Sequence, residues 1–147
     1  MKNCVFCNII ERKIPADIVY ENSKVIAILD AYPANPGHTL VIPKNHYETM
    51  VEVPDPIIVE ISKVIKELSK AVLEATGAKG FNIFQNNGKV AGQVVDHAHF
   101  HIVPRFKDDG LIVGFRVKEP YEFQDKYKYE VGEARKIRQN IRSALAE

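Results

Sequence analysis

The feature that most constrains the fold is a run in which imidazole and apolar side chains alternate. Residues 97–103 read HAHFHIV, so His97, His99 and His101 occupy every second position. Successive side chains of a β-strand point to opposite faces, so the three imidazoles share one face and the apolar side chains share the other. The run therefore predicts a strand with a core on one side and a row of histidines on the other. Because the chain has 5 histidines in all, this clustering is not typical of an ordinary solvated strand face.

Two kinds of chemistry fit the histidine row. In the first, His97, His99 and His101 chelate one catalytic metal ion, since imidazoles at alternate strand positions suit metal binding. In the second, one neutral imidazole is a nucleophile, and its neighbours orient it and stabilise charge. The loop before the row, residues 86–93, reads NNGKVAGQ and offers amide and backbone N–H donors for phosphate oxygens. This loop favours the nucleophile.

The other predicted elements surround this run. A long helix is predicted from Pro54 to Gly77, because apolar residues recur at three-and-four spacing between these positions. We expect Asp55 to cap it, Pro56 to take its first position and Gly77 to close it in a left-handed conformation. A second helix is expected over residues 132–146, and strands are expected over residues 18–21, 25–29, 38–42, 81–85 and 94–103.

These elements predict one α+β domain in which helices pack against an antiparallel sheet. The turn at Asn22 and Ser23 joins the first two strands as a hairpin. Pro43 is expected to end the third strand, and Pro104 the last one. No repeat or linker divides the sequence, so we expect a single domain over residues 1–147.

Charge and hydropathy argue against several classes of protein. The 20 Lys and Arg residues nearly balance the 19 Asp and Glu residues, without a block of like charge, which argues against nucleic-acid partners and a polybasic membrane anchor. The longest strongly apolar run, residues 25–29, is far shorter than the roughly 20 residues of a membrane helix. The N-terminus becomes charged at residues 11–13, which leaves no room for the apolar core of a signal peptide. We therefore expect a cytoplasmic protein with no nucleic-acid or membrane partner.

The two cysteines, Cys4 and Cys7, are too close in sequence to staple a fold. In a reducing compartment such a pair indicates metal binding or redox chemistry. No thioredoxin-like strand and helix precede the pair, which favours metal binding over a redox role.

The motif of residues 92–105, GQVVDHAHFHIVPR, resembles the signature of the histidine triad (HIT) superfamily. The resemblance covers further stretches of about the first 105 residues: 4–7, 29–46 and 86–88. Within the superfamily the chain is most similar to the nucleotide-binding branch of small homodimeric nucleoside phosphoramidate hydrolases. This implies a HIT-like α+β fold, with a core over about residues 1–105, a C-terminal extension over about 106–147, and a sheet that continues across a homodimer.

The resemblance implies a nucleotide hydrolase or transferase. Its central histidine, His99 here, attacks the α-phosphorus of a purine nucleotide derivative: a nucleoside phosphoramidate, an adenylated amine or a dinucleoside polyphosphate. Water then releases the nucleoside monophosphate from the nucleotidyl-histidine. His101 matches the last histidine of the triad, which contacts the phosphate, and His38 matches an upstream histidine of the same network. The alternative is a nucleotide-binding regulatory module with incidental turnover, because Val94 stands where many members of this branch carry Ser or Thr.

The resemblance also implies which residues bind the substrate. Asp30 matches the carboxylate that accepts hydrogen bonds from the ribose hydroxyls, a role suited to an acceptor-only group. Asn86 and Gln93 match residues at the phosphate and leaving-group end. The apolar walls of the purine pocket correspond to Val5, Phe6, Ile9 and Leu29.

The same resemblance implies that two histidines complete a metal site with the cysteine pair. Many relatives that begin with Cys-x-x-Cys hold zinc at four positions, which match Cys4, Cys7, His46 and His97. Two thiolates and two imidazoles form a closed tetrahedral set of the kind that structural zinc uses. We therefore expect one structural zinc ion per chain, which ties the N-terminal segment to the strand that carries the nucleophile.

Overall fold

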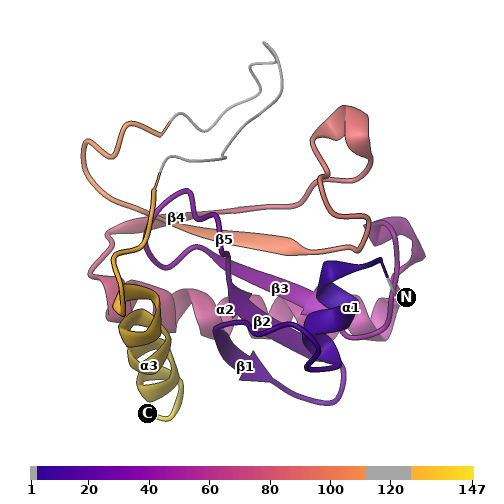
Figure 1. Ribbon diagram of the computed structural model, residues 1–147, viewed down its shortest axis with the longest axis horizontal. Coiled ribbons are helices and arrows are strands. Elements are labelled where there is room, and N and C mark those ends of the chain that lie inside the picture. Colours follow the sequence, from indigo (N-terminus) through magenta and orange to yellow (C-terminus); the bar gives the residue numbers. More distant parts are fainter. Residues whose placement is uncertain (1–2, 112–126) are drawn as a thin grey trace.

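The computed structural model describes residues 3–111 and 127–147 and contains an antiparallel sheet flanked by helices (Figure 1). Its strands are β1 (Ile18–Glu21), β2 (Val25–Leu29), β3 (Thr39–Pro43), β4 (Gly80–Phe84) and β5 (Phe100–Arg105). Its helices are α1 (Val5–Ile10), α2 (Asp55–Thr76) and α3 (Glu133–Leu145), with 3-10 turns over Met50–Glu52 and Lys89–Ala91. The predicted α+β class is confirmed; part of the expected C-terminal extension, residues 112–126, lies outside the described residues.

The strands are ordered β1-β2-β3-β5-β4, and each neighbouring pair is antiparallel. β1 and β2 form the predicted hairpin at the predicted bounds. β2 and β3 are buried at every position, because side chains pack against both faces of the sheet. This two-sided burial explains why residues 25–29 form a continuous apolar run instead of an alternating one.

The last strand differs from its prediction. β5 begins at Phe100 rather than at residue 94, and it continues through Pro104 instead of ending there. Before the strand begins, the N–H of Ala98 donates to the carbonyl oxygen of Tyr47 at 2.7 Å, so this part of the chain bonds to a loop. β3 pairs with β5 only as far as Ile102, so on that side Pro104 has no ladder bond to break.

Two other strands are displaced by one residue from their predicted bounds. β3 starts at Thr39 and includes Pro43, which was expected to lie beyond its end. β4 begins and ends one residue earlier than predicted. The shift of β3 leaves His38 just before the strand, where its carbonyl oxygen accepts from the N–H of Asp30 at 2.8 Å.

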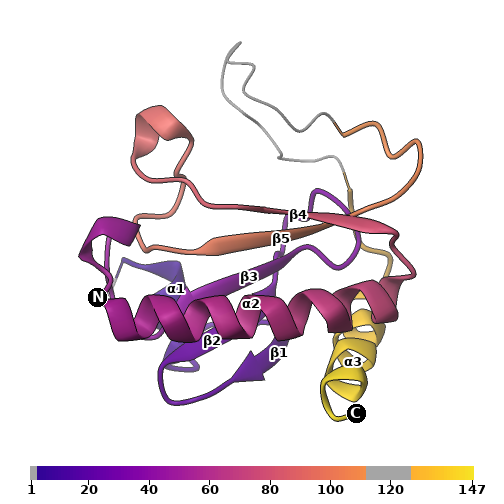
Figure 2. The same cartoon turned by 180° about the vertical axis from the view of Figure 1, so that it is seen from behind.

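The long helix α2 lies across one face of the sheet, as the view from behind shows (Figure 2). Gly77 ends it with a φ of 73°, in the left-handed region that glycine tolerates, as predicted. The prediction that Asp55 caps the helix is wrong, because Pro54 is the N-cap residue and Asp55 is already helical. Its carboxylate lies instead in the first turn, where the helix dipole favours negative charge. Pro56 is therefore the second helical residue, at which no intrahelical N–H bond is needed either.

Alternate residues of the central strands enter two separate cores. The core under α2 and α3 takes the odd-numbered residues of β2, the middle residue of β3 and three apolar residues of the histidine run: Val25, Ala27, Leu29, Val41, Ala98, Phe100 and Ile102. The core on the α1 side takes the even-numbered residues, with two residues of α1: Ile26, Ile28, Leu40, Ile42, Phe6 and Ile9. The apolar side of the histidine run therefore faces α2, and the imidazoles face the α1 side.

Helix α1 was not predicted from the sequence. Cys4 is its N-cap residue, and Sγ of Cys4 accepts from the N–H of Cys7 at 3.4 Å. Phe6 and Ile9 are buried against the sheet. A helix of 6 residues is not stable by propensity alone, so these tertiary contacts hold it.

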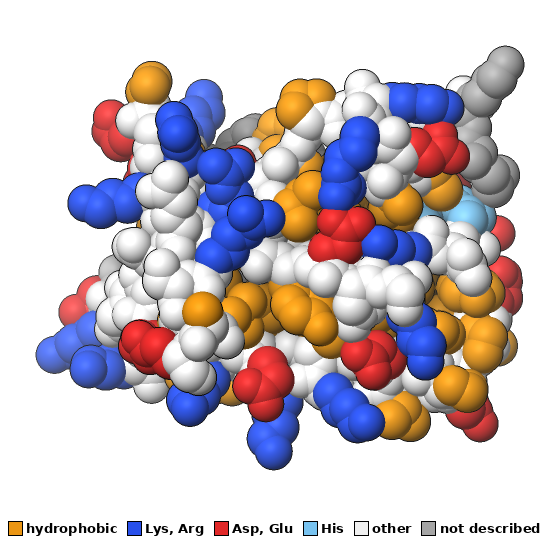
Figure 3. Space-filling view, turned by 90° about the horizontal axis from the view of Figure 1, so that it is seen from below, with side chains coloured by type: hydrophobic (Ala, Val, Ile, Leu, Met, Phe, Trp, Pro, Cys, Tyr) orange, Lys and Arg blue, Asp and Glu red, His pale blue; other side chains and the backbone are white. Residues whose placement is uncertain are grey.

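Helix α3 confirms the second predicted helix and packs against α2 and β1. Ile141 is completely buried, and Arg138 forms an ion pair with Asp17 at 3.0 Å. In Figure 3, Lys and Arg side chains are numerous at the end of the molecule that carries α3, where acidic side chains lie among them, and both charges also occur over the rest of this face between hydrophobic side chains. Among the helices that the structure describes, none is both long and apolar enough to cross a lipid bilayer.

Candidate active site

His99 lies just before β5, and its ring faces the α1 side of the sheet. Its Nδ1 lies 2.7 Å from the backbone carbonyl oxygen of His97. A carbonyl oxygen only accepts, so Nδ1 carries the proton and Nε2 keeps its lone pair. Burial lowers the pKa of His99, which keeps the ring neutral at pH 7. His99 is thus a neutral imidazole with one nitrogen free to attack an electrophile.

His38 and His101 form a hydrogen-bonded pair next to His99. The N–H of Ala34 donates to Nδ1 of His38 at 3.0 Å, so the proton of His38 is on Nε2. Nε2 of His38 donates to Nδ1 of His101 at 2.9 Å, which leaves the proton of His101 on its own Nε2. Burial lowers the pKa of His38 to about 3 and that of His101 to about 2, so both rings are neutral.

The ring of His101 is also held by its aromatic neighbours. Phe84 of β4 stacks on it with ring centroids 4.2 Å apart and an angle of 11° between the planes. The ring centroids of His99 and His101 are 4.9 Å apart. The structure therefore brings together the three residues predicted to be catalytic, with the Nε2–H of His101 as a donor beside the free nitrogen of His99.

Asp30 follows β2 and lies beside this pair. One of its carboxylate oxygens is 3.5 Å from Nε2 of His38, and the other accepts from the N–H of Tyr32 at 2.9 Å. Burial raises the pKa of Asp30 to about 6. Each carboxylate oxygen has a further lone pair, so Asp30 can still accept hydrogen bonds from the hydroxyl groups of a ligand.

Asp30, His38 and His101 offer three potential metal-ligand atoms within 4.8 Å of one another. The hydrogen bonds argue against a metal ion here. Nδ1 of His38 already accepts from Ala34, so a metal at Nε2 would require an imidazole with no proton on either nitrogen. The donor set therefore fits a hydrogen-bonded pair beside a carboxylate, not a metal centre.

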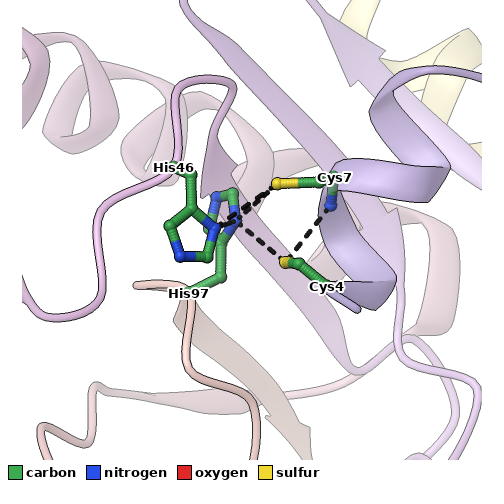
Figure 4. A group of neighbouring side chains, drawn as sticks. All are labelled: Cys4, Cys7, His46 and His97. Carbon is green, nitrogen blue, oxygen red and sulfur yellow. Dashed lines mark hydrogen bonds between the residues drawn. The ribbon is translucent and has the colours of Figure 1, made fainter. Parts of the chain in front are cut away.

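A second cluster brings together the four predicted metal ligands, Cys4, Cys7, His46 and His97 (Figure 4). The two Nδ1 atoms are 3.1 Å apart, and the sulfur-to-Nδ1 distances are 3.3 Å for Cys4 to His97, 3.4 Å for Cys7 to His46 and 3.6 Å for Cys7 to His97. Tetrahedral zinc, with Zn–S bonds of about 2.3 Å and Zn–N bonds of about 2.0 Å, spaces its ligand atoms about 3.3–3.8 Å apart. The cluster thus has nearly the size of a zinc tetrahedron.

The proton positions in the cluster also suit a metal. Nε2 of His97 donates to the carbonyl oxygen of Pro43 at 2.8 Å, so Nδ1 faces the sulfur atoms without a proton. Burial raises the pKa of the Cys7 thiol, and a bound divalent cation would oppose this by favouring the thiolate. The residues therefore fit zinc.

His97 contacts both clusters, but with different groups. Its side chain turns toward the cysteines, whereas its carbonyl oxygen accepts from His99. His101 in turn is bonded to His38. The alternative in which His97, His99 and His101 share one catalytic metal is therefore not supported, because the three rings have different partners.

The residues predicted to line the purine pocket do not all lie on one face. Phe6 contacts His97 and His99 edge-on, with ring centroids 5.8 and 5.0 Å away. Ile9 is buried in the same α1-side core as Phe6, and Val5 is partly exposed at the start of α1. Leu29 packs in the core under α2, on the opposite side of the sheet.

In the loop before the histidine run, Gln93 is 4% exposed and holds the loop together. Its side-chain oxygen accepts from the N–H of Gly88 at 2.7 Å, and its side-chain nitrogen donates to the carbonyl of Glu48 at 2.7 Å. Asn86 donates to the same loop at 3.4 Å. Because both polar ends of the Gln93 side chain bond to backbone groups, Gln93 would act on a ligand by holding the loop in place. Val94 follows and is 73% exposed.

Comparison with known proteins shows the family to which this chain belongs. Residues 11–108 match the family model of the HIT domain. The chain belongs to the HIT family. It is 51% identical over 112 residues to an uncharacterized HIT-like protein of Methanocaldococcus jannaschii, covering 76% of this chain and 86% of the relative. It is 41% identical over 117 residues to the adenosine 5′-monophosphoramidase HNT1 of Saccharomyces cerevisiae, covering 79% of this chain and 72% of the relative.

Solved HIT structures share the fold. The crystal structure of a Zn-bound histidine triad family protein from Mycobacterium smegmatis is 34% identical and has a TM-score of 0.80, covering 99% of this chain and 94% of that one. The resemblance inferred from the sequence, the HIT fold and the enzyme class, a hydrolase, are confirmed.

Some groups that organise this HIT site were not predicted. The proton positions depend on the N–H of Ala34 and the carbonyls of Pro43 and His97, and backbone groups leave no mark in a sequence. One further contact, the ion pair of Arg105 and Asp109, could have been found in the sequence from the i, i+4 spacing of its opposite charges. Arg105 forms an ion pair with Asp109 at 2.9 Å, which fixes the chain after β5.

Proposed function

We propose that this HIT protein hydrolyses purine nucleotide derivatives at the α-phosphate through a covalent nucleotidyl-His99. The observation that carries the proposal is the hydrogen bond of 2.7 Å from Nδ1 of His99 to the carbonyl of His97, which leaves Nε2 free. The Saccharomyces cerevisiae relative is named an adenosine 5′-monophosphoramidase, which supports adenosine phosphoramidates as the substrate class.

The reaction has two displacements at the same phosphorus. In the first, Nε2 of His99 forms a bond to the α-phosphorus while the bond from phosphorus to the leaving amine breaks, and the amine takes up a proton from solvent. In the second, water forms the new P–O bond, the N–P bond breaks, and its electron pair returns to Nε2. The water gives a proton to solvent, and the nucleoside monophosphate leaves.

His101 and His38 are assigned to the developing charge on the phosphate. The Nε2–H of His101 donates to a nonbridging phosphate oxygen, and this interaction strengthens as negative charge builds in the transition state. His38 acts through His101, because its Nε2–H fixes the tautomer of that ring at 2.9 Å. Neither residue needs to change its charge during the reaction.

The remaining predicted substrate residues are assigned to the parts of a nucleotide. Asp30 accepts from the ribose hydroxyls, since its carboxylate is partly exposed beside His38 with acceptor capacity left. Phe6, with Val5 and Ile9, is placed against the purine, because α1 packs next to His99. The loop of Asn86 and Gln93 is assigned to the phosphate and leaving group, whereas Leu29, the last residue of β2, packs in the core on the opposite face of the sheet.

Cys4, Cys7, His46 and His97 would hold one zinc ion per chain. All four positions of a tetrahedral zinc would be taken by protein atoms, so the ion would supply structure and not chemistry. It would fix α1 to the segment before β5, on which His99 lies. Thiol ligands need a reducing compartment, which is consistent with the cytoplasm.

A homodimer with a continuous sheet is also proposed. β4 lies at one edge of the sheet, while the other edge strand, β1, contacts α3. Phe81 and Ile83 of β4 expose apolar side chains. Pairing of β4 with its copy would cover them and continue the sheet. Light scattering should give the mass of two chains.

Trapping of the intermediate tests the catalytic proposal. The protein is mixed with adenosine 5′-phosphoramidate, quenched at neutral pH in denaturant and weighed intact. We expect an added adenylyl group in the wild type and none in His99→Asn, because the Asn amide can replace Nδ1–H but supplies no nucleophile. Zinc content should be equal in both. Nucleotide binding without adduct or monophosphate would favour the alternative, a binding module.

A further inference from the structure

Tyr129 joins the C-terminal segment to the loop that carries His38. Its hydroxyl oxygen accepts a hydrogen bond from the backbone N–H of Gly37 at 3.1 Å. The HIT domain match covers residues 11–108, so Tyr129 lies outside it. The contact places a side chain from beyond the matched domain one residue away from His38.

Gly37 is held tightly on several sides. Its φ is 89°, and a Cβ at this position would lie 2.6 Å from Cγ2 of Thr76 and 3.3 Å from Pro104. Its carbonyl oxygen accepts from the hydroxyl of Thr39 at 2.8 Å. Tyr129 adds the remaining bond, to the N–H. With both its backbone groups bonded and no room to move toward α2, Gly37 is a fixed point of the backbone.

His38 follows this fixed point directly. Its N–H donates to the carbonyl of Asn35 at 3.1 Å, and its carbonyl accepts from the N–H of Asp30 at 2.8 Å. The position of the His38 ring therefore depends on the backbone from Ala34 to His38, and Gly37 lies within this stretch. A small rotation at Gly37 would move Nε2 of His38 relative to Nδ1 of His101, which now lies 2.9 Å away.

Tyr129 is itself anchored by the start of α3. Its ring meets the ring of Tyr127 edge-on, with centroids 5.7 Å apart, and the hydroxyl of Tyr127 donates to Glu133 at 2.6 Å. α3 is fixed in turn by the buried Ile141. Burial raises the pKa of Tyr129, and the carboxylate of Asp30 adds to the rise, so the hydroxyl stays protonated.

We propose that Tyr129 is a positioning residue of the active site: by holding the N–H of Gly37 it keeps His38 in hydrogen-bond register with His101. The inference rests on the proposed function and extends it to the C-terminal segment. α3 thereby anchors the catalytic pair as well as covering α2.

The test compares Tyr129→Phe with Tyr127→Phe in the zinc-loaded chain of residues 1–147. Both changes remove one hydroxyl from the same segment and leave the rings in place, but only the first removes the acceptor of Gly37. We expect Tyr129→Phe to lower kcat for adenosine 5′-phosphoramidate about fivefold, as expected for one lost hydrogen bond, with little change in KM. Tyr127→Phe should leave kcat nearly unchanged, because the ring that contacts Tyr129 stays and only the bond from Tyr127 to Glu133 is lost.

NMR of ¹⁵N-labelled protein gives a readout that needs no substrate. In Tyr129→Phe the amide of Gly37 and the imidazole nitrogens of His38 and His101 should shift, whereas in Tyr127→Phe they should not. Wild-type resonances in Tyr129→Phe, or an equal loss of kcat in both variants, would overturn the proposal. If the wild type does not hydrolyse the phosphoramidate, the proposed function fails, and the NMR comparison still decides whether Tyr129 positions His38.

Discussion

Nε2 of His38 and Nδ1 of His101 lie 2.9 Å apart, and the proton between them belongs to His38. The N–H of Ala34 fixes this arrangement, because it occupies the other nitrogen of His38 at 3.0 Å. His101 is therefore held as the tautomer that presents Nε2–H. A single backbone amide thus decides which nitrogen of the neighbouring ring can donate to a substrate.

His101→Ala should lower kcat about 10²-fold, since it removes the proposed hydrogen-bond donor to the phosphate. His38→Ala should cost less, about tenfold, because Phe84 still holds the ring of His101. The double variant should be no slower than His101→Ala, since His38 acts through His101. Steady-state kinetics of the three variants decide this; multiplicative losses would mean that His38 contacts the substrate independently.

Asp30→Asn should stabilise the protein at neutral pH. The pKa of Asp30 is raised from 3.8 to about 6, so between these values the folded state binds more protons than the unfolded state. Stability therefore falls as pH rises through this window, and above pH 6 the full penalty is present. Asn carries no charge, so the variant should gain about 2 kcal/mol at pH 8 and little at pH 3.5. Its KM should rise through the loss of an ionised ribose acceptor.

Urea unfolding at both pH values measures this effect, with Asp109→Asn as the control. Side-chain hydrogen bonding from Arg105 holds the pKa of Asp109 below its usual value, so this carboxylate stabilises the fold at pH 8. Asp109→Asn should therefore change stability with the opposite sign. A loss of stability in Asp30→Asn at pH 8 would show that the charge of Asp30 is compensated in the folded state.

Removal of zinc should destabilise the protein before it affects chemistry at a bound phosphate. Cys7→Ser should lose the metal and lower Tm by several degrees, because a site that forms only in the folded state stabilises that state. Chelator-treated wild type should unfold like the variant and recover with added zinc, whereas the variant should not recover. Equal Tm values with and without zinc, by calorimetry, would contradict the structural role.

Val94→Ser should raise kcat/KM for adenosine 5′-phosphoramidate severalfold. Val94 is 73% exposed, so the change should cost less than about 0.5 kcal/mol of stability, while it adds a hydroxyl donor on the side of the proposed leaving-group site. Val90→Ser is the matched control, because Val90 is fully exposed on the same loop but lies farther from the histidine run in sequence. An equal response of both variants would place Val94 away from the substrate.

The sequence predicted those elements whose pattern is local. The hairpin and α2 have an apolar spacing that only one kind of element satisfies, and both form at nearly the predicted residues. The prediction that Asp55 caps α2 failed because the helix begins one residue earlier than the preferred cap type indicates: Pro54 is the N-cap residue, without a side-chain capping bond, and Asp55 is the first helical residue. α1 escaped prediction because its 6 residues are held by the sheet and the cysteine cluster.

The site was predictable as a set of residues but not as a set of roles. The alternation of the run placed His99 and His101 on one face, and their rings do lie 4.9 Å apart. The free nitrogen of His99 follows from a bond to a backbone carbonyl, and the separation of His97 follows from cysteines that lie about 90 residues earlier in the chain. Only the folded chain supplies these partners.

The two faces of the histidine run make its spacing as important as its composition. Ala98 and Phe100 fill the core beneath α2, while the imidazoles point the other way. Insertion of one residue between His99 and Phe100 would exchange the faces of the residues that follow, so that the imidazole of His101 would enter the hydrocarbon side and the phenyl ring of Phe100 would take the side of the histidines. A substitution in this segment alters one side chain on one face. A change of length instead moves the following side chains to the opposite faces, so that core packing and the histidine site are lost together.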